Sequence, residues 1–244
     1  RFQSNLVNRL WASMMGTGLV WPLDLHHGDN PATHPELLSL LAAEFAQHDF
    51  DIKWFLRELT LTKVYQRSST LQSPSSNVQK AEGEYRVFRE KALSPEQLMW
   101  SIFKATAVKS RYPIELDDEQ ELETTLPATV EQVQEHFNAS FANPPREPEV
   151  EFAPSVRGSL FLLNSELVQS WVNAGAGNST EQFLKISDNT EVISSLYITV
   201  LSRPPTAVES MQMREFLISQ PDRPEALAQL VWALLSCNEF LINH

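Results

Sequence analysis

The chain has 244 residues, 42% of them hydrophobic, so it can bury a substantial core and is not globally disordered. Its net charge of −12 argues against nucleic acid as a partner, because DNA and RNA bind basic surfaces. Seven glycines and little alternation of apolar and polar residues make a large sheet unexpected. We therefore predict a mainly α fold, an irregular multi-helix bundle with long loops and an acidic, proline-containing excursion.

A single cysteine, Cys237, limits the chemistry that this chain can support alone. It excludes an internal disulfide, a thiolate zinc site, an iron–sulfur cluster and a CxxCH haem attachment. Cys237 lies in an apolar helical pattern and is expected to be inert core. The apolar runs are far shorter than the roughly 20 residues of a membrane span, so no span is expected. Because the chain opens at Arg1 without a signal-like leader, we expect an excised domain.

Apolar residues at helical spacing predict a first helix from Phe2 to about Met15. Gly16 and Gly18 follow it and favour its end. Residues 19–31 then read as an extended loop that connects the first helix to the second.

The second helix has a strong start signal. Thr33 is placed to cap it, Glu36 to complete a capping box, and Pro35 to occupy its first turn. Asp51 is expected to cap a third helix that runs on to about Arg67. The first two helices and the loop between them therefore form a well-capped helix–loop–helix unit.

Residues 71–78 are rich in serine and predict an exposed loop. Ser94 and Gln97 then form a capping box ahead of a further helix. Helices are also predicted from Thr129 to about Phe141 and, after a turn at Asn164, through the apolar residues that follow. Four more capping pairs predict a helical array at the end of the chain: Ser179 with Gln182, Asp188 with Glu191, Thr206 with Glu209, and Asp222 with Glu225.

We read the chain as one α-helical domain that divides into two lobes. Residues 1–110 form the N-terminal lobe and residues 158–244 the C-terminal lobe in this division. Residues 111–157 form an acidic, proline-rich connecting segment.

The stretch from Glu115 to Glu151 holds eleven acidic residues against Arg146 alone, so it carries −10 of the net charge of −12. Such a segment can dock a cationic surface, on another domain of the same polypeptide or on a separate protein. A loose calcium site and a solvated excursion that aids solubility are the alternatives. The candidate interaction residues are Glu115, Asp117, Asp118, Glu119, Glu121 and Glu123.

The loop before the second helix holds a local cluster of imidazole and carboxylate side chains, the ligand set of zinc, manganese or non-haem iron. Such loop residues commonly form capping and turn hydrogen bonds, and the alternative is a divalent metal that serves binding or metal-assisted hydrolysis. No HExxH spacing supports the metal, and no serine-hydrolase, nucleotide or dinucleotide motif occurs in the chain. The candidate metal ligands are Asp24, His26, His27, Asp29 and His34.

Carbohydrate binding is a third hypothesis, because exposed indole rings can stack on sugars. The candidate residues are Trp21, Trp54 and Trp171. At helical positions, however, tryptophan is more often part of a core.

Seven short motifs together resemble one known family, the C-terminal domain of unknown function in planctomycete-type multidomain proteins. These proteins often carry upstream cytochrome-c-like (PSCyt) modules. The motifs are Asn8–Trp11, Gly16–Val20, Thr33–Leu38, Thr62–Ser69, Leu160–Ser165, Leu201–Thr206 and Ser236–Phe240.

The resemblance covers nearly all of the chain and weakens between Gln72 and Pro145. It implies a helical, extracytoplasmic module of a larger protein, working beside haem electron transfer or polysaccharide breakdown. Any haem would then belong to an upstream domain, and the resemblance supplies no catalytic residues. We therefore expect a non-catalytic accessory or interaction domain.

Overall fold

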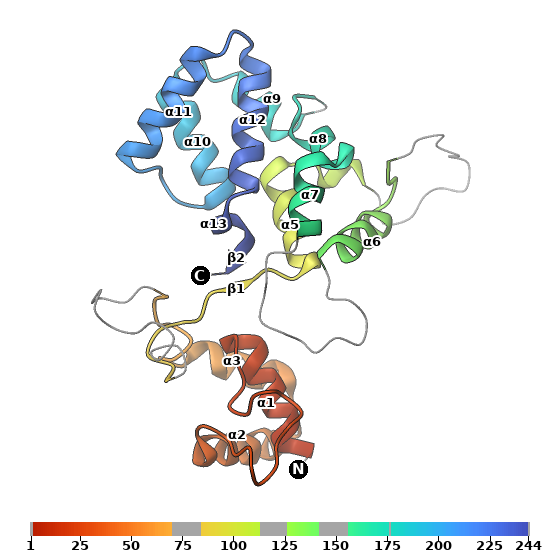
Figure 1. The fold of residues 1–244 in the computed structure, drawn as a ribbon, viewed down its shortest axis with the longest axis vertical. Helices are drawn as coiled ribbons and strands as arrows, with labels where there is room; N and C mark the ends of the chain where they lie inside the picture. Colours follow the sequence, from red (N-terminus) through yellow and green to blue (C-terminus); the bar gives the residue numbers. More distant parts are fainter. Residues whose placement is uncertain (1, 70–83, 113–125, 142–155, 176, 244) are drawn as a thin grey trace. The chain divides into compact units, whose positions relative to one another are not determined.

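A computed structural model describes residues 2–69, 84–112, 126–141, 156–175 and 177–243 (Figure 1). The described residues are mainly α-helical, and their only strands are two residues long, so the predicted fold class is confirmed. The chain divides into two compact units, Arg1–Lys91 with His244, and Ala92–Asn243. Among the described residues, no helix has the length and apolar character to cross a membrane.

The described residues of the first unit contain three helices around one apolar cluster. Its largest fully buried side chains include Phe45, Phe55 and Leu59, which the second and third helices contribute. The first helix packs against both of the others. The helices are α1 (Phe2–Met15), α2 (Pro35–Gln47) and α3 (Ile52–Leu61).

The capping predictions for this unit are only partly confirmed. Asp51 caps α3 by accepting from the Trp54 backbone N–H, as expected. The predicted cap of α2 is wrong, since His34 occupies the N-cap position and makes no side-chain capping bond. The Thr33 hydroxyl instead donates to the Leu19 carbonyl at 3.1 Å, because the preceding loop brings this acceptor close.

The predicted extent of α3 is also wrong, since this helix ends at Leu61 rather than near Arg67. Thr62 follows with an extended backbone, and its hydroxyl donates to the Leu59 carbonyl. A threonine hydroxyl in this position competes with the next helical hydrogen bond, which explains the early end.

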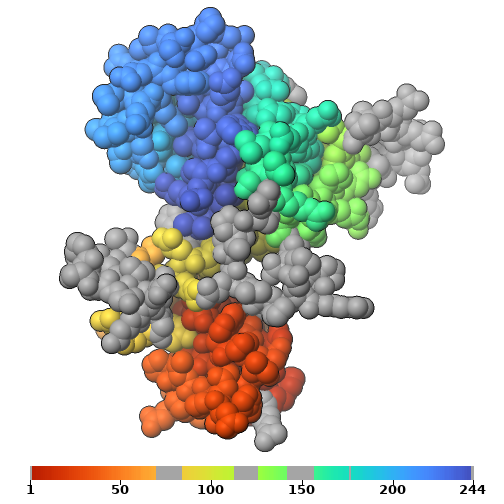
Figure 2. Space-filling view, viewed as in Figure 1, coloured from red at the N-terminus to blue at the C-terminus, as the bar shows by residue number. Residues whose placement is uncertain are grey.

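The second unit is a larger helical array in which α12 packs against α8, α9, α10 and α11. Its core includes Trp171, Ile102 and Leu227, all fully buried. Figure 2 shows the surface of α12 (blue) directly against that of α7 and α8 (teal). The elements are β1 (Lys91–Ala92), α5 (Pro95–Thr106), η1 (Lys109–Arg111), α6 (Val130–Phe141), α7 (Val156–Asn164), α8 (Glu166–Val172), α9 (Ser179–Leu184), α10 (Asn189–Leu201), α11 (Ala207–Ser219), α12 (Arg223–Leu235), α13 (Asn238–Leu241) and β2 (Ile242–Asn243).

Most capping predictions for this unit are confirmed. Ser94 and Thr206 each form the predicted capping box, and Asp188 and Asp222 cap the helices that follow them. The prediction for Ser179 is wrong. Asn178 is the N-cap of α9, because the Ser179 hydroxyl donates to the Ala105 carbonyl on α5.

Cys237 was expected to lie inside a helix, and this was wrong. Helix α12 ends at Leu235, and Cys237 is the N-cap of α13. It is half-buried, and burial raises the pKa of its thiol. The boundary between the units, after Lys91, differs from the predicted lobe boundary at residue 110, and α5 packs against α6 and α9 in the second unit.

Candidate functional site

The loop between α1 and α2, residues 16–34, is held to α1 by the side chain of Asn8. This amide is only 2% exposed. Its Nδ2 donates to the Val20 carbonyl and its Oδ1 accepts from the Val20 N–H, each at 2.9 Å. A buried asparagine with both amide atoms bonded to one backbone residue fixes the loop at that point.

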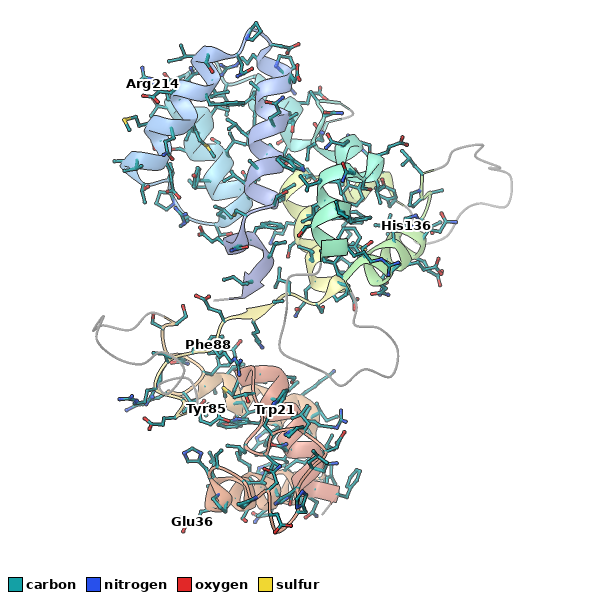
Figure 3. All side chains as sticks on the ribbon, viewed as in Figure 1. Trp21, Glu36, Tyr85, Phe88, His136 and Arg214 are labelled. Carbon is teal, nitrogen blue, oxygen red and sulfur yellow. The ribbon has the colours of Figure 1, made fainter. Side chains whose placement is uncertain are left out.

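Gly18 and Tyr85 secure the same loop from another direction. A Cβ at Gly18 would lie 2.5 Å from the Val20 carbonyl oxygen and 2.8 Å from Leu23 Cδ2, so only glycine fits. The Tyr85 hydroxyl donates to the Gly18 carbonyl at 3.1 Å. Burial raises the pKa of Tyr85, whose side chain is labelled in Figure 3, and this keeps the phenol a donor.

Asp24, the first candidate metal ligand, pairs with Arg9 of α1. Arg9 Nη2 lies 2.6 Å from Asp24 Oδ2, and Nε donates to Oδ1 at 3.2 Å. This hydrogen-bonded pair holds the pKa of Asp24 below its usual range. Metal binding by Asp24 would therefore compete with Arg9.

His26, His27 and Asp29 lie exposed on the loop. His27 Nδ1 accepts from the Asp29 backbone N–H at 3.2 Å and lies 3.8 Å from Asp29 Oδ2. Asn30 closes the turn, since its amide donates to the carbonyls of Trp21 and Leu25. Within the candidate set, His27 and Asp29 thus lie close together, and the backbone N–H of Asp29 joins them.

His34 lies at the start of α2. Its ring meets the Tyr85 ring edge to face, with centroids 5.8 Å apart, and its Nδ1 is 3.2 Å from the Thr33 hydroxyl. In the parts of the chain that the structure describes, no three His, Cys, Asp or Glu side chains gather as a metal site requires. The metal site therefore stays a prediction.

The candidate interaction residues Glu115, Asp117, Asp118, Glu119, Glu121 and Glu123 lie outside the described residues. Two further acids of the same segment, Glu131 and Glu135, are described. Both are exposed on α6.

The three candidate tryptophans lie in different environments. Trp171 is fully buried and donates its Nε1–H to the Tyr112 hydroxyl at 2.7 Å, so the hypothesis of an exposed Trp171 was wrong. Trp54 is half-buried, with its ring stacked on His48. Trp21 is 37% exposed and precedes a cis Pro22.

Sequence reasoning missed a charged cluster in the second unit, formed by Arg203, Glu209 and Glu239. Arg203 binds both carboxylates through paired hydrogen bonds of 2.5 to 3.0 Å. The Arg203 hydrogen bonds lower the pKa of Glu209 to about 2. Arg203 also lies over the Tyr197 ring, and burial raises the pKa of that phenol to about 12.

This cluster connects two motifs that are distant in the chain, since Arg203 lies in Leu201–Thr206 and Glu239 in Ser236–Phe240. In the sequence, the only indication of this contact was that one motif carries a positive charge, Arg203, and the other a negative charge, Glu239. Their pairing is non-local, so helical periodicity could not reveal it.

Comparison with known proteins gives one family. The model of PSD1, a protein family of unknown function (DUF1553), matches residues 1–217. No curated protein and no solved structure matches the chain.

Proposed function

The chain belongs to this family of unknown function, and we propose that it is a non-catalytic helical interaction domain of a larger extracytoplasmic protein. The observation that carries the proposal is the charge of −10 in Glu115–Glu151, in a chain of net −12. A dense acidic segment attracts a cationic surface and can raise an association rate by about 10- to 1,000-fold. The partner is then another domain of the same polypeptide or a separate cationic protein.

The motif residues support an accessory role, because their polar side chains are used within the fold. Asn8 bonds the backbone of Val20, and Arg203 bonds Glu239. A catalytic polar group would instead need to be presented to a substrate. In the proposed arrangement, redox chemistry belongs to a cytochrome-c-like module elsewhere in the larger protein, and any haem is held there.

Charge neutralisation tests the docking. The variant Glu119→Gln/Glu121→Gln/Glu123→Gln should bind the remaining domains of the full-length protein, supplied as a separate chain, several-fold more weakly than the native domain at about 10 mM salt. The loss should appear mainly in the association rate, and it should shrink at about 1 M salt, where the Debye length falls to about 3 Å. Surface plasmon resonance measures both.

The matched control neutralises three exposed acids outside the segment, Glu58, Glu96 and Glu215, and makes the net charge less negative by the same amount. Equal binding by the native domain and the segment variant at low salt contradicts the docking proposal. An equal loss in the control variant also contradicts it, because net charge rather than the segment would then govern binding.

A metal-binding or metal-assisted hydrolase site in the loop is the second candidate, favoured by the approach of His27 to Asp29 at 3.8 Å. His26 lies beside this pair in the chain, and His34 and Asp24 would have to leave their present partners to join it. Elemental analysis of the purified domain, native and with His26→Ala or His27→Ala, tests this candidate. A native protein without bound zinc, manganese or iron contradicts it.

A further inference from the structure

The second unit contains a hollow that no motif pointed to, lined by residues of α7, α8 and α12 and by Asn173. Its volume of about 340 Å³ lies within the range of about 300 to 1,000 Å³ that is typical of small-molecule sites. The side chains that matter for binding are Leu163, Gln169, Asn173, Glu225, Gln229 and Trp232.

The polar part of this lining is suited to hydroxyl groups. The amides of Gln169, Asn173 and Gln229 each offer both donors and acceptors, and a hydroxyl is likewise both. Glu225 adds a carboxylate acceptor. Among the described lining residues there is no lysine, arginine or histidine, so nothing offsets this carboxylate and an anionic ligand is disfavoured.

The apolar part of the lining is an indole ring with a fixed position. Trp232 is half-buried, and its Nε1–H donates to the Leu162 carbonyl at 2.8 Å. Leu163, 48% exposed, adds a second apolar contact. An aromatic surface beside several planar hydrogen-bonding groups matches a pyranose, whose C–H face is apolar and whose rim carries hydroxyls.

Much of the hollow is built before any ligand arrives. The fully buried Asn178 donates to the Asn173 carbonyl at 2.6 Å and to the Trp171 carbonyl at 2.9 Å. Gln229 Nε2 donates to Glu225 Oε1 at 3.2 Å. Among the described residues, the side-chain amides of Gln169 and Asn173 have no hydrogen-bond partner, so these groups are available to a ligand.

We propose that this hollow binds a neutral saccharide unit, with the amides of Gln169, Asn173 and Gln229 on its hydroxyls and Trp232 beneath its apolar face. This site differs from the one first considered for sugars, because it excludes Trp21, Trp54 and Trp171. It is also independent of the proposed docking function, which rests on the acidic segment.

The experiment begins with an array of neutral, anionic and amino oligosaccharides. The array is followed by titration of the strongest neutral hit into ¹⁵N-labelled protein. The native protein should bind neutral glycans, and the Trp232 indole N–H signal should shift, assigned by its loss in Trp232→Phe. The double variant Gln169→Ala/Asn173→Ala should bind about tenfold more weakly, as expected for the loss of two hydrogen bonds.

Gln212→Ala is the matched control, an exposed helical glutamine of the same unit on α11, and should leave binding unchanged. The double variant should keep the native amide spectrum elsewhere, since its two side chains lie outside the core. No neutral hit overturns the proposal. A hit that leaves the Trp232 signal unmoved, equal loss in the control, or binding only of anionic or amino sugars also overturns it.

Discussion

Asn8 bonds the backbone of Val20 as a strand partner would, with one donor and one acceptor. Because the amide is buried, its removal leaves two backbone groups without partners in a dry environment. We expect Asn8→Ala to lower the free energy of unfolding of the first unit by about 2–3 kcal/mol, measured by urea denaturation. Asn5→Ala, at an exposed position of the same helix, should change it by less than about 0.5 kcal/mol.

Gly18 and Gly28 provide a second comparison within one loop. A methyl group at Gly18 would lie within 3 Å of backbone and side-chain atoms. A methyl group at Gly28 would have no such atom within 4 Å. Gly18→Ala should therefore destabilise the first unit by about 1–3 kcal/mol in thermal unfolding. Gly28→Ala should be neutral or slightly stabilising, because alanine restricts the unfolded chain. Equal effects of the two changes would contradict this packing argument.

At this scale, the sequence identified the polar residues correctly but not their partners. Thr33 and Ser179 have the composition and position of helix caps, yet their hydroxyls donate to Leu19 and Ala105. These acceptors are distant in the chain, so local spacing could not indicate them. The loop histidines were visible as a cluster for the opposite reason, since they are close in sequence.

At the level of the helices, Glu209 has two structural roles at the start of α11. Its carboxylate accepts from the Thr206 N–H at 2.7 Å, which completes the capping box, and it also binds Arg203. Glu209→Gln retains an acceptor for the cap but loses the charge-assisted bonds. We expect a loss of about 1–2 kcal/mol in the free energy of unfolding at pH 7.

The pH dependence of this loss follows from the pKa of Glu209, which falls from 4.5 to about 2 in the folded protein. A depressed carboxyl pKa stabilises the fold above pH 4.5, and this contribution disappears as the pH falls from 4.5 to about 2. The native protein and Glu209→Gln should thus converge in stability towards pH 2. Denaturation at several pH values checks this, and a constant difference over that range would contradict it.

Helix starts in the second unit were predictable because capping is local. Ser94, Asp188, Thr206 and Asp222 each bond backbone groups within three residues, a distance at which sequence spacing is informative. The sugar-binding proposal shows the opposite case. Gln169 and Trp232 are far apart in the chain, and only helix packing brings them to one hollow.

For the whole molecule, composition and periodicity predicted the mainly α class, while the division into units depended on which helices pack together. Among the residues that the structure describes, the two units have separate apolar clusters with no residue in common. Helix α5 shows why the boundary was difficult to predict, since its apolar face suits either cluster by periodicity alone. Its buried residues, such as Ile102, belong to the cluster of the second unit.

Separate clusters predict separate responses to core damage. Ile102→Ala should reduce protection from hydrogen exchange in α12 by an amount that corresponds to about 2–5 kcal/mol and leave α1 unchanged, because Ile102 belongs to the apolar cluster that includes the buried residues of α12. Phe45→Ala should have the reverse effect, lowering protection in α1 and sparing α12. Mass spectrometry of exchanged peptides measures both helices in one sample. If either change weakened α1 and α12 equally, the two units would be a single cooperative structure, and separate apolar clusters would not mean separate stabilities.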